Sequence, residues 1–253
     1  MIARYGNRYF KLKVAGDPAA DVARLARIAA VLDRLPEPYF VTLDGNEQYA
    51  DAAGIEELWR RIESEPRLAR LAAAVLFVEQ PIARARALEE HVGGIPRPVI
   101  IDESDDSLGA FPQARALGYR GVSSKTSKGI YRSLVNAARC AAWNAEAGAG
   151  TYFLSAEDLT IQPGLALQQD LALVSLLGIT HVERNGRHYV NGMAGAPRTE
   201  QQAFLAAHPD LYEESHGAVR VRIEGGMLAI GSLEAPGYAS RAMPDWNSMR
   251  RMS

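Results

Sequence analysis

The residues best able to do chemistry are two lysines and three carboxylates that recur at regular intervals along the chain. Each one ends a short apolar run, and they are Lys13, Asp44, Glu79, Asp102 and Lys125. Three carboxylates in one place carry a charge that a hard divalent cation such as Mg²⁺ neutralises. A metal between two lysines suits abstraction of a proton next to a carboxylate, because both cations stabilise the charge that develops.

A further lysine, Lys11, stands two positions before Lys13 in the run "RYFKLKV" at residues 8–14. Side chains two apart in a strand point to the same face, so the two ammonium groups repel each other. A lysine is a poor base at neutral pH because its amine is protonated, and a neighbouring ammonium and a metal favour the neutral amine. The pair therefore indicates a basic amine, with a solvated strand face as the plainer alternative.

The elements that must position these residues alternate along the chain. Runs rich in strand-forming residues are found at 8–14, 38–44, 73–80, 97–103, 119–125, 150–158 and 179–184. Between them lie segments with helical spacing of apolar residues, of which the clearest are 17–35, 55–73 and 127–148. Strands that alternate with helices predict an α/β protein with a parallel sheet.

The positions of the ionisable residues favour a closed barrel over an open sheet. The successive spacings between them are 31, 35, 23 and 23 residues, about one strand–helix unit each. In a (β/α)8 barrel the carboxyl ends of all strands converge on one pocket, whereas an open doubly wound sheet gathers only the strands near its switch point. Residues 218–231 predict an antiparallel hairpin with Gly225 and Gly226 at its turn.

Composition limits the possible partners and compartments. The chain has 253 residues, 47% of them apolar, and a net charge of −2, so binding to nucleic acid or a membrane surface has no electrostatic support. A single cysteine, Cys140, excludes an internal disulfide and fits a reducing cytoplasm. The longest apolar run, residues 71–78, is too short to span a bilayer.

Five motifs, taken together and in order, resemble the barrel of the enolase superfamily, closest to its muconate-lactonizing and mandelate-racemase-like branch. They are "FKLKV", "VTLDGNEQY", "LFVEQP", "VIIDES" and "GVSSK", and the resemblance covers roughly residues 4 to 190. It implies a TIM-type (β/α)7β barrel. It also implies Mg²⁺-dependent abstraction of the proton α to a carboxylate through an enediolate, as in a racemase or epimerase, a cycloisomerase or an acid-sugar dehydratase.

The resemblance also implies roles for individual residues. Lys13 and Lys125 would be the acid/base groups on opposite faces of a small carboxylate substrate, and Lys11 would tune Lys13 and help to bind the carboxylate. Asn46 would support the metal site or the substrate. The implied metal ligands are Asp44, Glu79 and Asp102. Further substrate-binding candidates are Glu157 and Asp158, which could equally cap the helix that follows them.

The sequence departs from the pattern of that branch at two places. The segment after Lys125 lacks the expected pair of glycines, and the chain begins just before the strand of Lys13, where a capping domain and a first barrel strand are expected. We therefore expect a homo-oligomer, or a partner chain that covers the missing strand and cap. The alternative function is a catalytically inactive truncated barrel that acts as a structural or interaction module.

The expected domain organisation has three parts. Residues 1–190 would form the barrel, and residues 191–235 a C-terminal segment whose hairpin packs on a cap. Residues 236–253 show no clear periodicity and are expected to be a tail.

Overall fold

The structure is a computed structural model, and it describes residues 2–156, 162–183 and 189–249. The chain divides into two compact units. We call Arg8–Ser124 with Tyr131–Ser155 the sheet unit, and Met1–Asn7, Lys125–Ile130 and Ala156–Ser253 the hairpin unit. The expected boundaries at residues 190 and 235 stay predictions.

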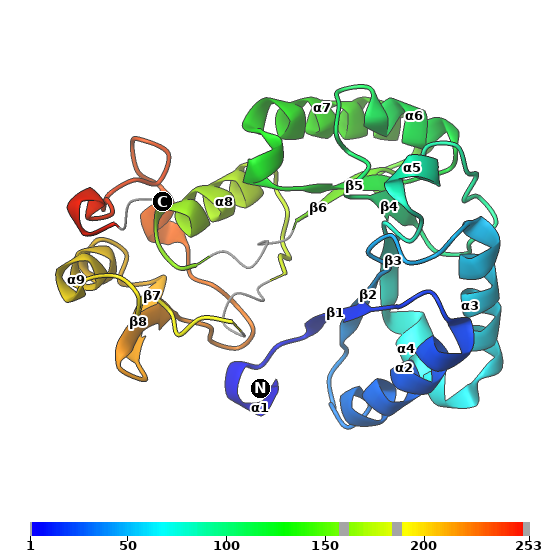
Figure 1. The fold of residues 1–253 in the computed structure, drawn as a ribbon, viewed down its shortest axis with the longest axis horizontal. Helices are drawn as coiled ribbons and strands as arrows, with labels where there is room; N and C mark the ends of the chain where they lie inside the picture. The colour runs from blue at the N-terminus through cyan, green and yellow to red at the C-terminus, as the bar shows by residue number, and fades with distance from the viewer. Residues whose placement is uncertain (1, 157–161, 184–188, 250–253) are drawn as a thin grey trace. The chain divides into compact units, whose positions relative to one another are not determined.

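A six-stranded sheet forms the centre of the sheet unit, with its strands side by side in chain order (Figure 1). The strands are β1 (Tyr9–Lys13), β2 (Phe40–Asp44), β3 (Val75–Glu79), β4 (Val99–Ile101), β5 (Gly121–Ser124) and β6 (Phe153–Ala156). They run parallel and the sheet curls into a half-barrel, which confirms the prediction of a TIM-type barrel architecture. Parallel strands bring their carboxyl ends to one edge, where the candidate residues lie.

Helices cover the outer side of the curled sheet (Figure 1). They are α2 (Pro18–Leu32), α3 (Ala52–Ser64), α4 (Ala69–Ala74), α5 (Arg84–Ala87), α6 (Ala110–Ala116) and α7 (Ile130–Ala147). The α2 helix begins at a capping residue: Asp17 accepts hydrogen bonds from the Ala19 and Ala20 amides, and Pro18 fills the first position. Its buried stripe includes Leu25, Ala29 and Leu32.

The helix expected at 55–73 is interrupted. The α3 helix ends at Ser64, and a 3₁₀ turn, Pro66–Leu68, separates it from α4. Proline has no amide hydrogen to donate and disfavours a helical conformation in the residue before it, so the chain turns at Glu65.

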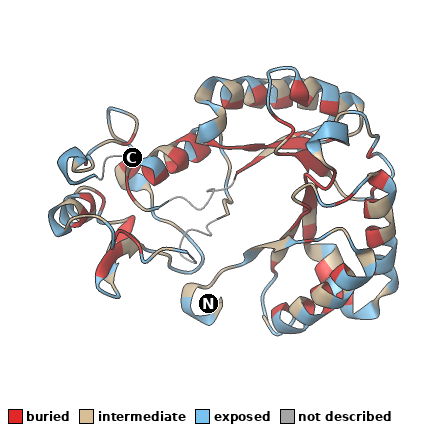
Figure 2. Ribbon diagram, in the orientation of Figure 1, coloured by how far each residue is buried: buried red, intermediate tan, exposed pale blue. Residues whose placement is uncertain are grey.

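Buried residues run along the strands and along one side of the helices (Figure 2), and many of them are apolar. In β2 and β3 the fully buried positions include Val41, Leu43 and Val78. Cys140, on α7, is also buried, and burial raises the pKa of its thiol to about 11, which disfavours the reactive thiolate. Across the described residues, no helix has the length and apolar character needed to cross a bilayer.

The hairpin unit has a separate apolar core. Its elements are α1 (Ile2–Tyr5), η2 (Thr126–Lys128), α8 (Leu165–Leu176), α9 (Arg198–Ala207), β7 (Tyr212–Ser215), β8 (Ala218–Val221), η4 (Gly231–Leu233) and η5 (Trp246–Ser248). Phe204 and Tyr212 meet edge to face with ring centroids 6.4 Å apart, and they pack with Leu167, Leu171 and Val219.

The unit contains the expected C-terminal hairpin, but the sequence placed its turn wrongly. The hairpin forms between β7 and β8, and its turn is His216–Gly217 with φ angles of 53° and 75°. Gly225 and Gly226 do make a turn, but it closes only the isolated bridge between Glu224 and Met227. In the described part of residues 179–184, Glu183 forms a single β-bridge, and its amide donates to the Ala156 carbonyl at the end of β6 at 3.3 Å. The strand expected at 179–184 stays a prediction, because residue 184 lies outside the described residues.

Candidate active site at the carboxyl ends of the strands

The first four strands of the sheet bring the predicted lysine and three carboxylates to one edge. In the parallel register Lys13 stands beside Asp44 and Asp44 beside Glu79. Glu79 pairs with Ile100, and Asp102 follows directly on the end of β4. All three carboxylates are buried. Buried charges need a cation or hydrogen-bond donors close by, so the surroundings of these acids determine what the edge can do.

Both lysines of β1 contact the same carboxylate. The ammonium of Lys11 lies 2.7 Å from Asp44 Oδ2 and 3.0 Å from Glu79 Oε2, and that of Lys13 lies 2.6 Å from Asp44 Oδ2. Their surroundings differ, because the Lys11 side chain is 7% exposed and the Lys13 side chain 49%. The negative charge of Asp44 therefore offsets the repulsion between the two ammonium groups.

The loop after β2 holds Asp44 and leads to Asn46. The Asn46 amide donates to Asp44 Oδ1 at 2.9 Å, and its side-chain nitrogen donates to Glu103 Oε1 at 3.2 Å. Gly45 allows this loop to touch the next one, since a Cβ there would lie 2.5 Å from the Pro81 Cα. Asn46 thus connects the ends of β2 and β4, as a residue that supports the site would.

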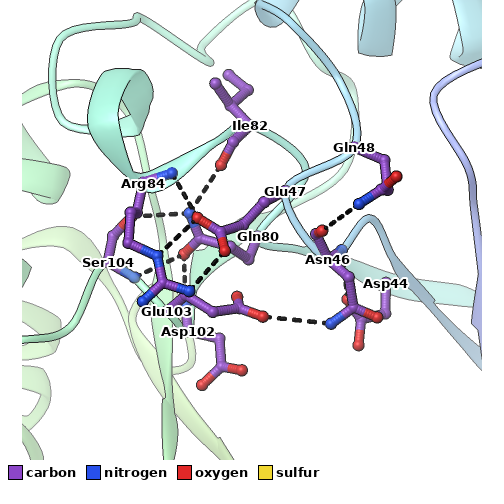
Figure 3. A network of polar contacts seen from close by, with 10 residues as sticks. All are labelled: Asp44, Asn46, Glu47, Gln48, Gln80, Ile82, Arg84, Asp102, Glu103 and Ser104. Atoms are coloured by element: carbon purple, nitrogen blue, oxygen red, sulfur yellow. Dashed lines mark hydrogen bonds and ion pairs between the residues drawn. The ribbon is translucent and has the colours of Figure 1, made fainter.

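A buried glutamine, Gln80, joins the end of β3 to the end of β4 (Figure 3). Its oxygen accepts from the amides of Asp102 at 2.8 Å and Ser104 at 3.1 Å. Its nitrogen donates to the Ser104 hydroxyl at 2.7 Å and to the Ile82 carbonyl at 2.9 Å. Sequence reasoning missed this residue, although a polar side chain directly after Glu79 in a buried strand is a signal.

A second residue missed from the sequence is Asp21, which joins the loops after β1 and β2. Both of its carboxylate oxygens accept from the Ala15 amide at 2.9 Å, and Tyr49 donates its hydroxyl to Asp21 at 2.7 Å. Burial, and then the bond to Asp21, raise the pKa of Tyr49 far above its usual range. Asp21 lies on α2, eight residues beyond Lys13, so it fixes the chain as it leaves β1.

The acids that follow Asp102 are only partly solvated. Burial raises the pKa of Glu103, and the adjacent charge of Asp102 adds to this. Asp105 is also buried, and its backbone carbonyl accepts a hydrogen bond from Arg132. Nearby, Glu47 forms a two-pronged ion pair with Arg84, at 2.8 Å to Nε and 2.6 Å to a terminal nitrogen, and this pair lowers the pKa of Glu47 (Figure 3).

Lys125 belongs to the hairpin unit, where it is buried at the start of a 3₁₀ turn. The next residue is held by Asp170 of α8, which accepts from the Thr126 amide at 3.2 Å and from its hydroxyl at 2.9 Å. The role of Lys125 with the residues of the sheet unit stays a prediction. Glu157 and Asp158 lie outside the described residues.

The donor set at the strand ends has the chemistry of a Mg²⁺ site, since carboxylate oxygens are what this cation prefers. Its present arrangement is different. Nowhere in the described part of the chain do three Asp, Glu, His or Cys side chains stand close enough together to hold a metal ion. Instead the Lys11 ammonium contacts Asp44 and Glu79. The residues therefore fit the metal in kind, and in this structure Lys11 contacts two of them.

Comparison with known proteins bears on the fold of the chain. Residues 1–242 match a family model described as "Enolase C-terminal domain-like", whereas no curated protein matches the chain. Three solved structures illustrate the similarity. A mandelate racemase/muconate lactonizing enzyme from Jannaschia sp. CCS1 is 19% identical, with a TM-score of 0.57 over 90% of this chain and 53% of its own.

The muconate lactonizing enzyme from Pseudomonas putida is 17% identical, with a TM-score of 0.55 over 91% of this chain and 55% of its own. An enolase-superfamily member from Roseovarius nubinhibens ISM, complexed with magnesium, is 19% identical, with a TM-score of 0.53 over 93% and 57%. At these identities the likeness shows the fold. The chain spans about half the length of the solved structures that it matches.

Proposed function

Because the chain belongs to the family of enolase C-terminal domain-like proteins, we propose that it abstracts the proton α to the carboxylate of a small organic acid. The observation that carries this proposal lies at the carboxyl ends of parallel strands, where Lys11 and Lys13 both contact Asp44 and Lys11 also contacts Glu79. In barrels of this type that edge is where chemistry takes place. The product would be an epimer, a cycloisomer or the result of β-elimination.

Lys13 is the proposed base of the sheet unit. Its side chain is half exposed and can meet a substrate, and its ion pair with Asp44 must open before the neutral amine can accept the α-proton. Lys125 is proposed as the acid/base group for the opposite face of the substrate. Lys11 and Asn46 are proposed to position the substrate carboxylate, together with Glu157 and Asp158, which lie outside the described residues.

Asp44, Glu79 and Asp102 are the proposed ligands of Mg²⁺, and the magnesium complex of a similar structure supports this choice of ion. When bound, the ion supplies positive charge against the negative charge that develops on the substrate carboxylate. Gln80 holds the backbone of Asp102 in place for this task. We further propose a cytoplasmic protein that acts as a homo-oligomer or with a partner chain beside β1.

The competing function is an inactive barrel that serves as a structural or interaction module. It is favoured by one observation: both lysines of β1 are engaged with Asp44. An ammonium held by a carboxylate is a poor base, because the ion pair stabilises the protonated form. The two proposed functions therefore make different demands on Lys13. An enzyme requires its ion pair with Asp44 to open when substrate is present, and an inactive module does not.

Exchange of the substrate α-hydrogen in D₂O separates the two functions. The full chain would be incubated with Mg²⁺ and a library of acid sugars and amino-acid derivatives, and exchange followed by proton NMR. We expect exchange with at least one acid, and a loss of about 10²–10⁴-fold in Lys13→Ala and in Lys125→Ala. Lys128→Ala is the matched control. No exchange by a folded, metal-loaded protein would favour the inactive module, and full exchange by Lys13→Ala would overturn its proposed role.

A further inference from the structure

Lys11 lies where a metal ion would have to meet two of its proposed ligands. Its ammonium is within hydrogen-bond distance of Asp44 on β2 and Glu79 on β3, and all three side chains are buried. Lys11 itself is on β1, so one cation connects three neighbouring strands. This is a different arrangement from that of Lys13, whose half-exposed side chain pairs with Asp44 and, among the described residues, with no other acid.

The charge balance explains why the position is filled. Two carboxylates on adjacent strands, away from water, repel each other and lose their hydration. A single ammonium between them offsets both effects at once. The register of β1 places Lys11 beside Thr42, two residues before Asp44, and the long lysine side chain covers the remaining distance along the strand.

We propose that the Lys11 ammonium is an internal counter-cation for Asp44 and Glu79, and that a divalent ion binds there only by displacing it. An ammonium and a divalent ion cannot both occupy the same pair of carboxylates, since two cations in a buried site repel strongly. Lys11 therefore keeps the site folded without metal and lowers its affinity for metal. The inference rests on the proposed function only for the identity of the ion.

Calorimetric titration of the full chain with MgCl₂ alone, at constant ionic strength, tests this competition. Lys11→Met removes the charge and keeps a side chain of similar length, and we expect its dissociation constant for Mg²⁺ to fall at least about tenfold. Lys13→Met removes a charge from the same Asp44 oxygen at an exposed position, so we expect a smaller change. Lys128→Met, remote in the chain from these acids, should titrate as the native protein does.

The outcomes distinguish this inference from the proposed function. Equal or weaker binding by Lys11→Met would overturn the inference and leave the proposed metal site intact. Binding by Lys11→Met but not by the native chain would support the inference and overturn metal-dependent catalysis by the native chain. No binding by either folded protein would overturn both.

A measurement on the native chain covers the case in which Lys11→Met does not fold. Acetic anhydride acetylates free amines, and mass spectrometry reports the extent of labelling at each lysine. Displacement predicts that saturating Mg²⁺ increases the labelling of Lys11 several-fold relative to Lys128. Labelling of Lys11 that does not change, in a sample shown by calorimetry to bind Mg²⁺, would overturn the inference.

Discussion

At the carboxyl ends of β2 to β4 the acidic side chains are buried, whereas charged side chains at the amino ends of these strands reach the solvent. Asp44, Glu79 and Asp102 are enclosed, and Lys11 is enclosed with them. At the other end Arg70 donates to three loop carbonyls before β2, those of Asp33, Leu35 and Glu37, while its guanidinium stays partly in water.

Arginines at the amino ends also stack on aromatic rings. Arg70 lies over the ring of Tyr39 with its guanidinium carbon 5.0 Å from the centroid, and Arg97 lies 4.8 Å from the ring centre of Trp59. Such contacts stabilise loops at little cost, because the cation keeps much of its hydration. Burying charge costs stability unless every partner is present. The amino ends show that exposed arginines can hold the loops of this sheet. The buried charges at the carboxyl ends are therefore not required by the fold, which favours a functional role for them.

The largest expected effect is that of Lys11→Met on stability without metal. Removing one partner of a buried ion pair leaves Asp44 and Glu79 with less compensating charge, and we expect a loss of about 3–5 kcal/mol in the free energy of unfolding. Chemical denaturation in a chelating buffer measures it. The matched variant Lys13→Met should lose no more than about 1 kcal/mol, since that side chain is half exposed.

Arg70→Met gives the counterpart at the amino ends. The three carbonyls that it leaves can take water, so we expect a loss of about 1 kcal/mol that does not depend on Mg²⁺. A loss as large as that of Lys11→Met would contradict the contrast between the two ends.

The next effect in size is that of Gln80→Leu, which removes four hydrogen bonds in the buried network of Figure 3. The amides of Asp102 and Ser104 lose their acceptor, and we expect about 1–3 kcal/mol of destabilisation. Because Gln80 positions a proposed ligand, the affinity for Mg²⁺ should also fall, by about 10–100-fold. Denaturation and calorimetry measure the two effects separately.

Gln113→Leu is the control for this variant, because Gln113 is exposed and its side chain donates to the Leu88 carbonyl. It should change stability by less than about 0.5 kcal/mol. A Gln80→Leu protein that is destabilised but binds Mg²⁺ normally would show that Gln80 has only a structural role.

Two buried tyrosines, one at each end of the strands, form a closely matched pair whose substitution should have a smaller effect on stability. Tyr49 donates its hydroxyl to Asp21 at the carboxyl ends, and Tyr39 donates to Asp33 at the amino ends, both at 2.7 Å. Asp21 is buried and Asp33 is partly exposed. We expect Tyr49→Phe to cost about 1.5 kcal/mol and Tyr39→Phe less, since water can replace the lost donor at Asp33. Equal losses in denaturation would argue against a difference in burial between the two ends.

The sequence predicts the strand ends well because their signal is local. An apolar run that ends in an ionisable residue marks a parallel strand, and carboxyl ends share an edge, so Lys13, Asp44, Glu79 and Asp102 could be placed together. Their ion pairs could not be predicted, because period-two alternation gives the direction of Lys11 but not what its ammonium reaches. Gln80 was missed for a similar reason, as its left-handed φ of 30° depends on the neighbouring loops.

The misplaced hairpin shows the same limit. Residues 212–215 read as polar, so only the arms on either side of Gly225 and Gly226 looked like strands. The structure pairs β8 with β7 instead, because Tyr212 packs against Phe204 in a core that joins segments distant in sequence. A burial preference of this kind is not visible in the periodicity of one short run.

The smallest effect concerns Glu47, which lies near the carboxyl ends but pairs with the largely exposed Arg84. The hydrogen bonds from Arg84 hold the pKa of Glu47 below its ordinary value of 4.5. The pair therefore contributes stability above the pKa of the unfolded chain, and this contribution is lost as the pH falls through the folded value. For an ion pair with an exposed partner we expect at most about 1 kcal/mol.

Denaturation of the native chain and of Glu47→Gln between pH 7 and pH 3 tests this. The native chain should be slightly more stable at pH 7, and the difference should shrink as the solution becomes acidic. Arg84→Gln should show the same trend, and the double variant should add nothing further, since both residues act through one contact. A difference that keeps its size down to pH 3 would mean that Glu47 stabilises the loop by packing rather than by charge. The Glu47–Arg84 pair could then no longer serve as an example of an exposed ion pair that contributes little stability through its charge.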